Sequence, residues 1–106
     1  LARSDTLVAP EKGALTRLPR GSRTIAAELF AAPWVAAESG DGQEVLGVAF
    51  DFPALQNVTL RPGGGGYNYV LFNPKAESPG KMTFWLTGLQ GNAQAVADWA
   101  ARLPRP

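Results

Sequence analysis

Hydrophobic residues alternate with small or polar ones along residues 44–52, which predicts a β-strand with one buried face. The apolar positions of this strand are Leu46, Val48, Phe50 and Phe52. A shorter alternating run predicts a second strand over residues 55–61, and a third and a fourth strand are predicted over residues 67–73 and 81–87. The connections between these strands contain proline and glycine and are short, which favours antiparallel neighbours.

The hydrophobic period lengthens to that of a helix after Asn92. Apolar residues line one face of this predicted helix at Ala93, Val96, Ala97, Ala100 and Leu103. Asn92 is a favourable N-cap, and Pro104 ends the helix. A shorter helix is predicted over residues 24–32, because Ile25 and Leu29 share a face and a proline follows.

These elements predict an α+β fold: an antiparallel sheet of about four strands packed by a C-terminal amphipathic helix and a short N-terminal helix. Residues 1–23 are interrupted by two prolines and two glycines, so we expect an irregular arm or linker there. Residues 24–106 are expected to form a single α+β domain, since a chain of 106 residues is too short for two good cores.

The composition argues against an enzyme, because the chain contains no histidine and no cysteine. These residues supply most general bases near neutral pH, most reactive nucleophiles and most zinc ligands. No nucleophile–base pair is evident among the remaining side chains. We therefore predict no catalytic residues, no metal and no cofactor. The four glycines at 63–66 precede a predicted strand, whereas phosphate-binding loops precede a helix.

The net charge of +1 predicts no strong electrostatic field and carries no strong nucleic-acid signature. Its distribution is uneven: residues 1–23 carry five positive and two negative charges, and residues 24–60 carry five negative charges and no positive one. This segregation is interpreted as solvated charge, with a basic face for an acidic partner as the alternative.

No segment reads as a transmembrane helix, since the longest apolar stretch, residues 25–37, contains Glu28 and Pro33. The chain begins with Leu1, so we expect a processed product or an excised domain. An extracytoplasmic or cell-envelope location is slightly favoured.

The aromatic residues of the third and fourth predicted strands are the candidate binding residues. If Met82, Phe84 and Leu86 point inward, the alternate side chains of that strand point outward. The candidate contact residues are then Thr83, Trp85 and Thr87, together with Tyr67 and Tyr69 on the neighbouring strand. Core packing of these aromatics is the alternative interpretation.

These observations together favour a non-enzymatic module that binds another protein, with self-association through an unpaired edge strand as one mode. A larger assembly of the bacterial envelope, such as a secretion or pilus machine, is the expected setting. The order of strand, glycine-containing turn and closing helix occurs there and in many unrelated folds, so it identifies no family. The alternative is a module that stacks sugar or single-stranded nucleic acid on Tyr67, Tyr69 and Trp85.

Overall fold

The computed structural model describes residues 5–51, 55–63, 67–76 and 82–104. Within these ranges the chain forms eight β-strands, one 3₁₀ turn (η1) and one α-helix. Their bounds are β1 Thr6–Glu11, β2 Ala14–Leu18, β3 Arg23–Ala26, η1 Ala27–Leu29, β4 Trp34–Glu38, β5 Glu44–Phe50, β6 Leu55–Pro62, β7 Asn68–Pro74, β8 Phe84–Gln90 and α1 Ala93–Ala101.

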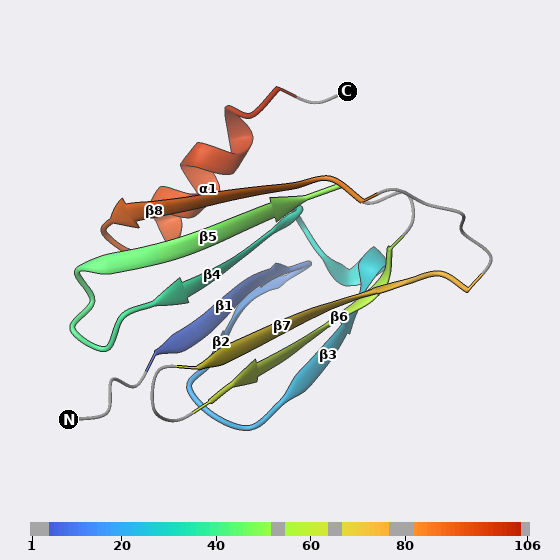
Figure 1. Cartoon of the computed structure of the whole chain (residues 1–106), viewed down its shortest axis with the longest axis horizontal. Helices are drawn as coiled ribbons and strands as arrows, with labels where there is room; N and C mark the ends of the chain where they lie inside the picture. The colour runs from blue at the N-terminus through green and yellow to red at the C-terminus, as the bar shows by residue number, and fades with distance from the viewer. Residues whose placement is uncertain (1–4, 52–54, 64–66, 77–81, 105–106) are drawn as a thin grey trace.

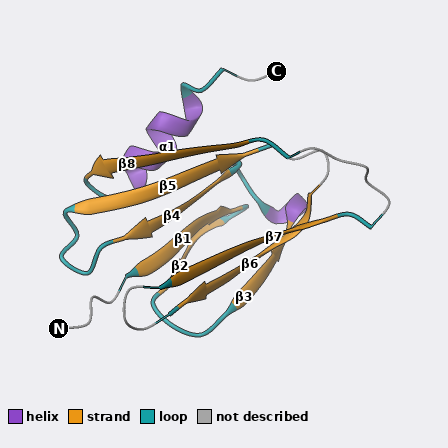
Figure 2. Cartoon of the chain, viewed as in Figure 1, coloured by secondary structure: helices purple, strands orange, loops and turns teal. Residues whose placement is uncertain are grey.

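The strands form two antiparallel sheets, which we call the five-stranded sheet and the three-stranded sheet. Their strand orders are β2-β1-β4-β5-β8 and β3-β6-β7. Figure 1 shows α1 against one face of the five-stranded sheet, with β3, β6 and β7 on the other side. The protein is therefore built in three layers, and strands dominate two of them (Figure 2).

The central strands of the five-stranded sheet are covered on both faces, which divides the buried residues into two cores. The first core lies between the two sheets and includes Leu7, Val35 and Phe50. The second core lies under α1 and includes Val45 and Val96. Strand β5 thus places apolar residues of both phases in contact with other layers, so its pattern is only partly alternating.

The expected four-stranded sheet with an N-terminal helix is wrong. Residues 24–32 contain the end of β3 and the short turn η1, which has no side-chain cap. Ile25 is fully buried and pairs with Val58 of β6. A helix this short is marginal by itself, and pairing with β6 buries Ile25 more completely than one exposed helical turn would.

Residues 6–18, for which we expected irregular structure, form the hairpin of β1 and β2. Gly13 adopts φ +89° in its turn, a conformation that favours glycine. Strand β1 buries Leu7, Val8 and Ala9 consecutively, because it lies inside the five-stranded sheet and contacts both cores. A continuous apolar run of three residues carries no period, so the sequence pattern did not reveal this strand.

The C-terminal helix and three of the four predicted strands are confirmed. Asn92 caps α1, since its Oδ1 accepts a 2.9 Å hydrogen bond from the Gln94 N–H. The strands predicted at 44–52, 55–61 and 67–73 correspond to β5, β6 and β7, although Phe52 and the glycines at 64–66 lie outside the described residues. The fourth strand lies at residues 84–90, three residues later than predicted.

A buried carboxylate joins α1 to the sheet. Glu38 is 8% exposed at the end of β4, and its carboxylate accepts a 2.8 Å hydrogen bond from the Ala93 N–H in the first turn of α1. The same carboxylate forms an ion pair with Arg17, which reaches over from β2. Glu38 therefore satisfies a free N–H at the helix start and helps to fix α1 on the five-stranded sheet.

Candidate functional site

The side chains of β8 alternate between the two faces as expected, but the face expected to be buried is the more exposed one. Leu86 is 80% exposed and Phe84 is 42% exposed, whereas Trp85 is half-buried against the second core. Thr87 is half-buried on the α1 side, and Thr83 lies exposed just before β8. Both phases of β8 carry large apolar residues, so only the position of α1 determines which phase is covered.

Tyr69 lies on the outer face of the three-stranded sheet, and Tyr67 lies just before β7. Tyr67 is 71% exposed, and Tyr69 is also exposed, with the guanidinium carbon of Arg61 6.0 Å from its ring centroid. Trp85 lies on the far side of the five-stranded sheet, under α1. The structure therefore separates Tyr67 and Tyr69 from Trp85 and Thr87, and the role of each in binding stays a prediction.

A different surface stands out: part of the inner face of the five-stranded sheet is uncovered where β5 meets β8. Leu46 of β5 is 67% exposed, and Leu86 of β8 is still more exposed. A cavity of about 300 Å³ lies beside them. We call it the open groove, and its lining includes Leu46 and Val48 of β5, Asn68 and Val70 of β7, and Leu86 of β8.

The strand register explains why these leucines are uncovered. Leu7, Ala37, Leu46 and Gly88 form one cross-strand row over β1, β4, β5 and β8. Leu7 in this row packs in the first core under the three-stranded sheet, whereas Leu46 lies beyond it. The covering sheet has three strands and the covered sheet has five, so no strand among the described residues covers the inner face of β5 and β8 around Leu46 and Leu86.

One end of the open groove is closed by aromatic rings. Phe30, Phe50, Phe72 and Phe84 contact one another in sequence, with centroid separations of 5.4, 5.1 and 4.8 Å. The edge-to-face geometry of these pairs is the favourable one for aromatic packing. The Phe72–Phe84 contact joins β7 to β8, so the two edge strands meet at this end.

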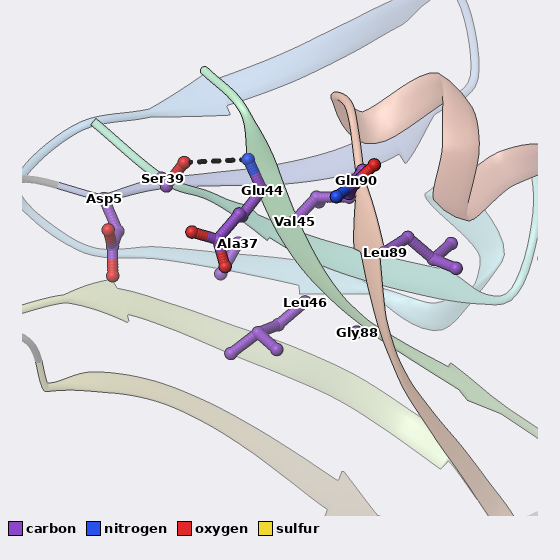
Figure 3. Close-up of a pocket in the computed structure, with 9 residues that line it drawn as sticks. All are labelled: Asp5, Ala37, Ser39, Glu44, Val45, Leu46, Gly88, Leu89 and Gln90. Carbon is purple, nitrogen blue, oxygen red and sulfur yellow. Dashed lines mark hydrogen bonds between the residues drawn. The ribbon is translucent and has the colours of Figure 1, made fainter. Parts of the chain in front are cut away.

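The other end of the open groove is polar and acidic (Figure 3). A hollow of about 630 Å³ is lined there by Asp5, Ser39, Glu44 and Gln90, next to Leu46. The turn before β5 is well ordered by hydrogen bonds, since the Glu44 N–H donates to Ser39 Oγ at 3.1 Å. Asp5 and Glu44 are the charged residues among those that line the two cavities, and both are acidic.

Two acceptor atoms at this acidic end have no donor among the described residues. Asn68 Nδ2 donates to Asp5 Oδ2 at 3.0 Å and links β7 to the start of β1. The remaining oxygens, Asp5 Oδ1 and Asn68 Oδ1, are buried and have no hydrogen-bond partner. A buried acceptor without a donor costs free energy, so the Asp5–Asn68 contact is not fully satisfied among the described residues.

The described residues include no cluster of three acidic, histidine or cysteine side chains that could hold a metal ion. Nor does any helix in the described ranges have the length and apolar character needed to cross a membrane. The groove combines an apolar floor, two strand edges and an acidic end, an arrangement suited to binding. Its residues escaped sequence reasoning because Leu46 and Leu86 were assigned to the core.

Comparison with known proteins adds nothing to this geometry, since no family model, curated protein or solved structure matches the chain.

Proposed function

We propose that this protein is a non-enzymatic module that binds another protein through the open groove. The observation that supports the proposal is the exposure of Leu46 and Leu86 on the inner face of a β-sheet. Isolated surface leucines are ordinary, but two adjacent ones beside an apolar cavity and two strand edges form a surface typical of protein interaction sites. An assembly of the cell envelope remains the proposed setting.

Charge substitution at the groove tests this proposal. Leu46→Asp and Leu86→Asp place a carboxylate on a solvent-exposed position, so the fold is expected to tolerate them. Leu15→Asp is the matched control, because Leu15 is 49% exposed on β2 at the opposite edge of the same sheet.

The measurement is quantitative capture from an extract of the source organism, with each variant immobilised. The proposal expects a discrete protein that wild type and Leu15→Asp retain and that both groove variants lose. Sedimentation at several concentrations checks in parallel whether the partner is a second copy of the chain. Retention of the same proteins by Leu86→Asp and wild type would refute the role of the groove.

A second candidate function is supported by the outer face of the three-stranded sheet. Tyr69 exposes its aromatic ring there, Tyr67 exposes one just before β7, and Arg61 lies over the Tyr69 ring. Such a face can stack bases or sugar rings. Titration with a thymidine oligonucleotide and with a soluble oligosaccharide, using Tyr69→Ala as the variant, tests this function independently of the groove.

A further inference from the structure

The open groove lies beside β7, where a further strand of the three-stranded sheet would lie. Neighbouring strands in a sheet lie about 4.8 Å apart, and packed sheets lie about 10 Å apart. Strand β7 is the edge of the three-stranded sheet, and its Asn68 and Val70 line the groove opposite Leu46 and Val48 of β5. One more strand beside β7 would therefore lie over the uncovered part of β5 and β8.

A strand paired with the edge of β8 would not cover the exposed leucines in the same way. The Asp51 N–H donates to the Thr83 carbonyl at 3.2 Å, and the Gly91 N–H donates to the Gln43 carbonyl at 2.9 Å. Because hydrogen-bonded pairs alternate along an antiparallel ladder, the backbone groups of Leu86 and Gly88 point away from β5. A strand paired with them would extend the five-stranded sheet sideways and leave Leu46 uncovered.

The acidic end of the groove indicates the charge of the occupant. Asp5 and Glu44 line the hollow there, and none of the described residues that line either cavity is basic. A lysine or arginine side chain supplies the complementary charge and N–H donors for these carboxylates.

We infer that the open groove binds an extended segment of a partner protein that pairs with the free edge of β7 and completes the three-stranded sheet. Alternate apolar side chains of this segment cover Leu46 and Leu86, and a lysine or arginine next to them reaches Asp5 and Glu44. This inference rests on the proposed function and specifies its partner as a basic, alternating strand. Main-chain hydrogen bonds supply the affinity, and the alternate side chains supply the specificity.

Synthetic peptides of about seven residues, the length of β7, test the inference on the whole chain. The first peptide alternates valine and threonine and ends in two lysines, with both termini blocked. The second has two glutamates in place of the lysines. The third has the composition of the first, with its valines made contiguous so that the alternation is lost. Binding is followed by anisotropy of a labelled peptide, and bound backbone amides are located by hydrogen exchange.

The inference expects the first peptide to bind the wild type and to slow amide exchange along β7, while exchange at Leu86 and Gly88 is unchanged. The glutamate peptide and the contiguous peptide are expected to bind at least about tenfold more weakly, and Glu44→Lys is expected to reverse the preference for lysine. Leu86→Asp is expected to abolish binding, and Leu15→Asp to leave it intact.

Two results would overturn the inference: slowed exchange at Leu86 and Gly88 without protection of β7, or equal binding of all three peptides. Either result leaves the proposed function standing if Leu86→Asp still loses the protein captured from the extract. Capture that is unaffected by Leu86→Asp overturns the proposed function itself, so the two failures are distinguishable.

Discussion

Substitution of Gly47 by alanine is expected to destabilise the protein because α1 approaches β5 closely there. A Cβ atom at this position would lie 2.7 and 2.8 Å from the two γ-methyl carbons of Val96. Carbon atoms in contact prefer about 3.5–4.0 Å, so each of these contacts is short by roughly 1 Å. Val96 is fully buried, which leaves its methyl groups no free space to move into.

Gly88→Ala is the matched control, and it allows the magnitude to be separated from the effect of glycine itself. Gly88 also lies in a paired strand, but a Cβ there meets only Leu46 Cδ2 at 3.5 Å, an ordinary contact. Both substitutions reduce the freedom of the unfolded chain, which stabilises by about 0.4–1 kcal/mol. The difference between the two variants therefore isolates the overpacking cost at Gly47, about 1–3 kcal/mol.

Urea unfolding followed by tryptophan fluorescence measures this difference. For a denaturant slope of about 2 kcal/mol/M, Gly47→Ala is expected to unfold about 0.5–1.5 M urea earlier than Gly88→Ala. In a Val96→Ala background the cost of Gly47→Ala should disappear, because the two methyl groups that it meets are gone. Equal midpoints for Gly47→Ala and Gly88→Ala would refute the close approach of α1 to β5.

Three further outcomes are expected from the contacts of single side chains. Glu38→Ala removes the acceptor of the Ala93 N–H and should lower the free energy of unfolding by about 1–3 kcal/mol in urea titrations, with loss of helical circular dichroism at lower urea. The Arg23 guanidinium hydrogen-bonded to Glu11 holds the pKa of that carboxyl below its ordinary value. The contribution of the Glu11–Arg23 ion pair to stability is therefore complete above about pH 4.5 and is lost as the pH falls through the pKa of Glu11 in the folded protein. In the Arg23→Ala variant, NMR titration should find the pKa of Glu11 raised. Trp85→Ala should destabilise by about 2 kcal/mol, roughly half the cost for a fully buried aromatic, and an unchanged urea midpoint would instead support a purely surface role.

Local patterns in the sequence were sufficient for the elements whose signals are local. The helix at 93–101 combines a cap, one apolar face and a following proline, all within one short segment. Strands β6 and β7 each keep one face in the first core and the other in solvent, so exposure alternates along β7 and along β6 from Asn57 on, and Val58 and Leu60 alternate with polar residues in β6. The predicted bounds of these strands are correct to within one or two residues, because the environment of each strand is the same along its length.

The candidate site could not be predicted, because it depends on how much of one sheet another sheet covers. Leu46 and Leu86 have the composition and phase of core residues, and the same alternation places Phe50 in the first core and Leu46 in solvent. No local signal distinguishes the two. Apolar residues lie on both faces of β5 and β8, which indicates only that each face needs a covering layer.

The sequence by itself determined the absence of histidine and cysteine chemistry, the antiparallel strands after residue 44 and the capped C-terminal helix. Only the tertiary structure decided that residues 6–26 contribute three strands, that Trp85 packs under α1, and that a groove opens between β7 and β8. The physical reason is that pairing and covering are long-range events: β3 forms because β6 lies beside it, and Leu46 is exposed because the three-stranded sheet ends at β7.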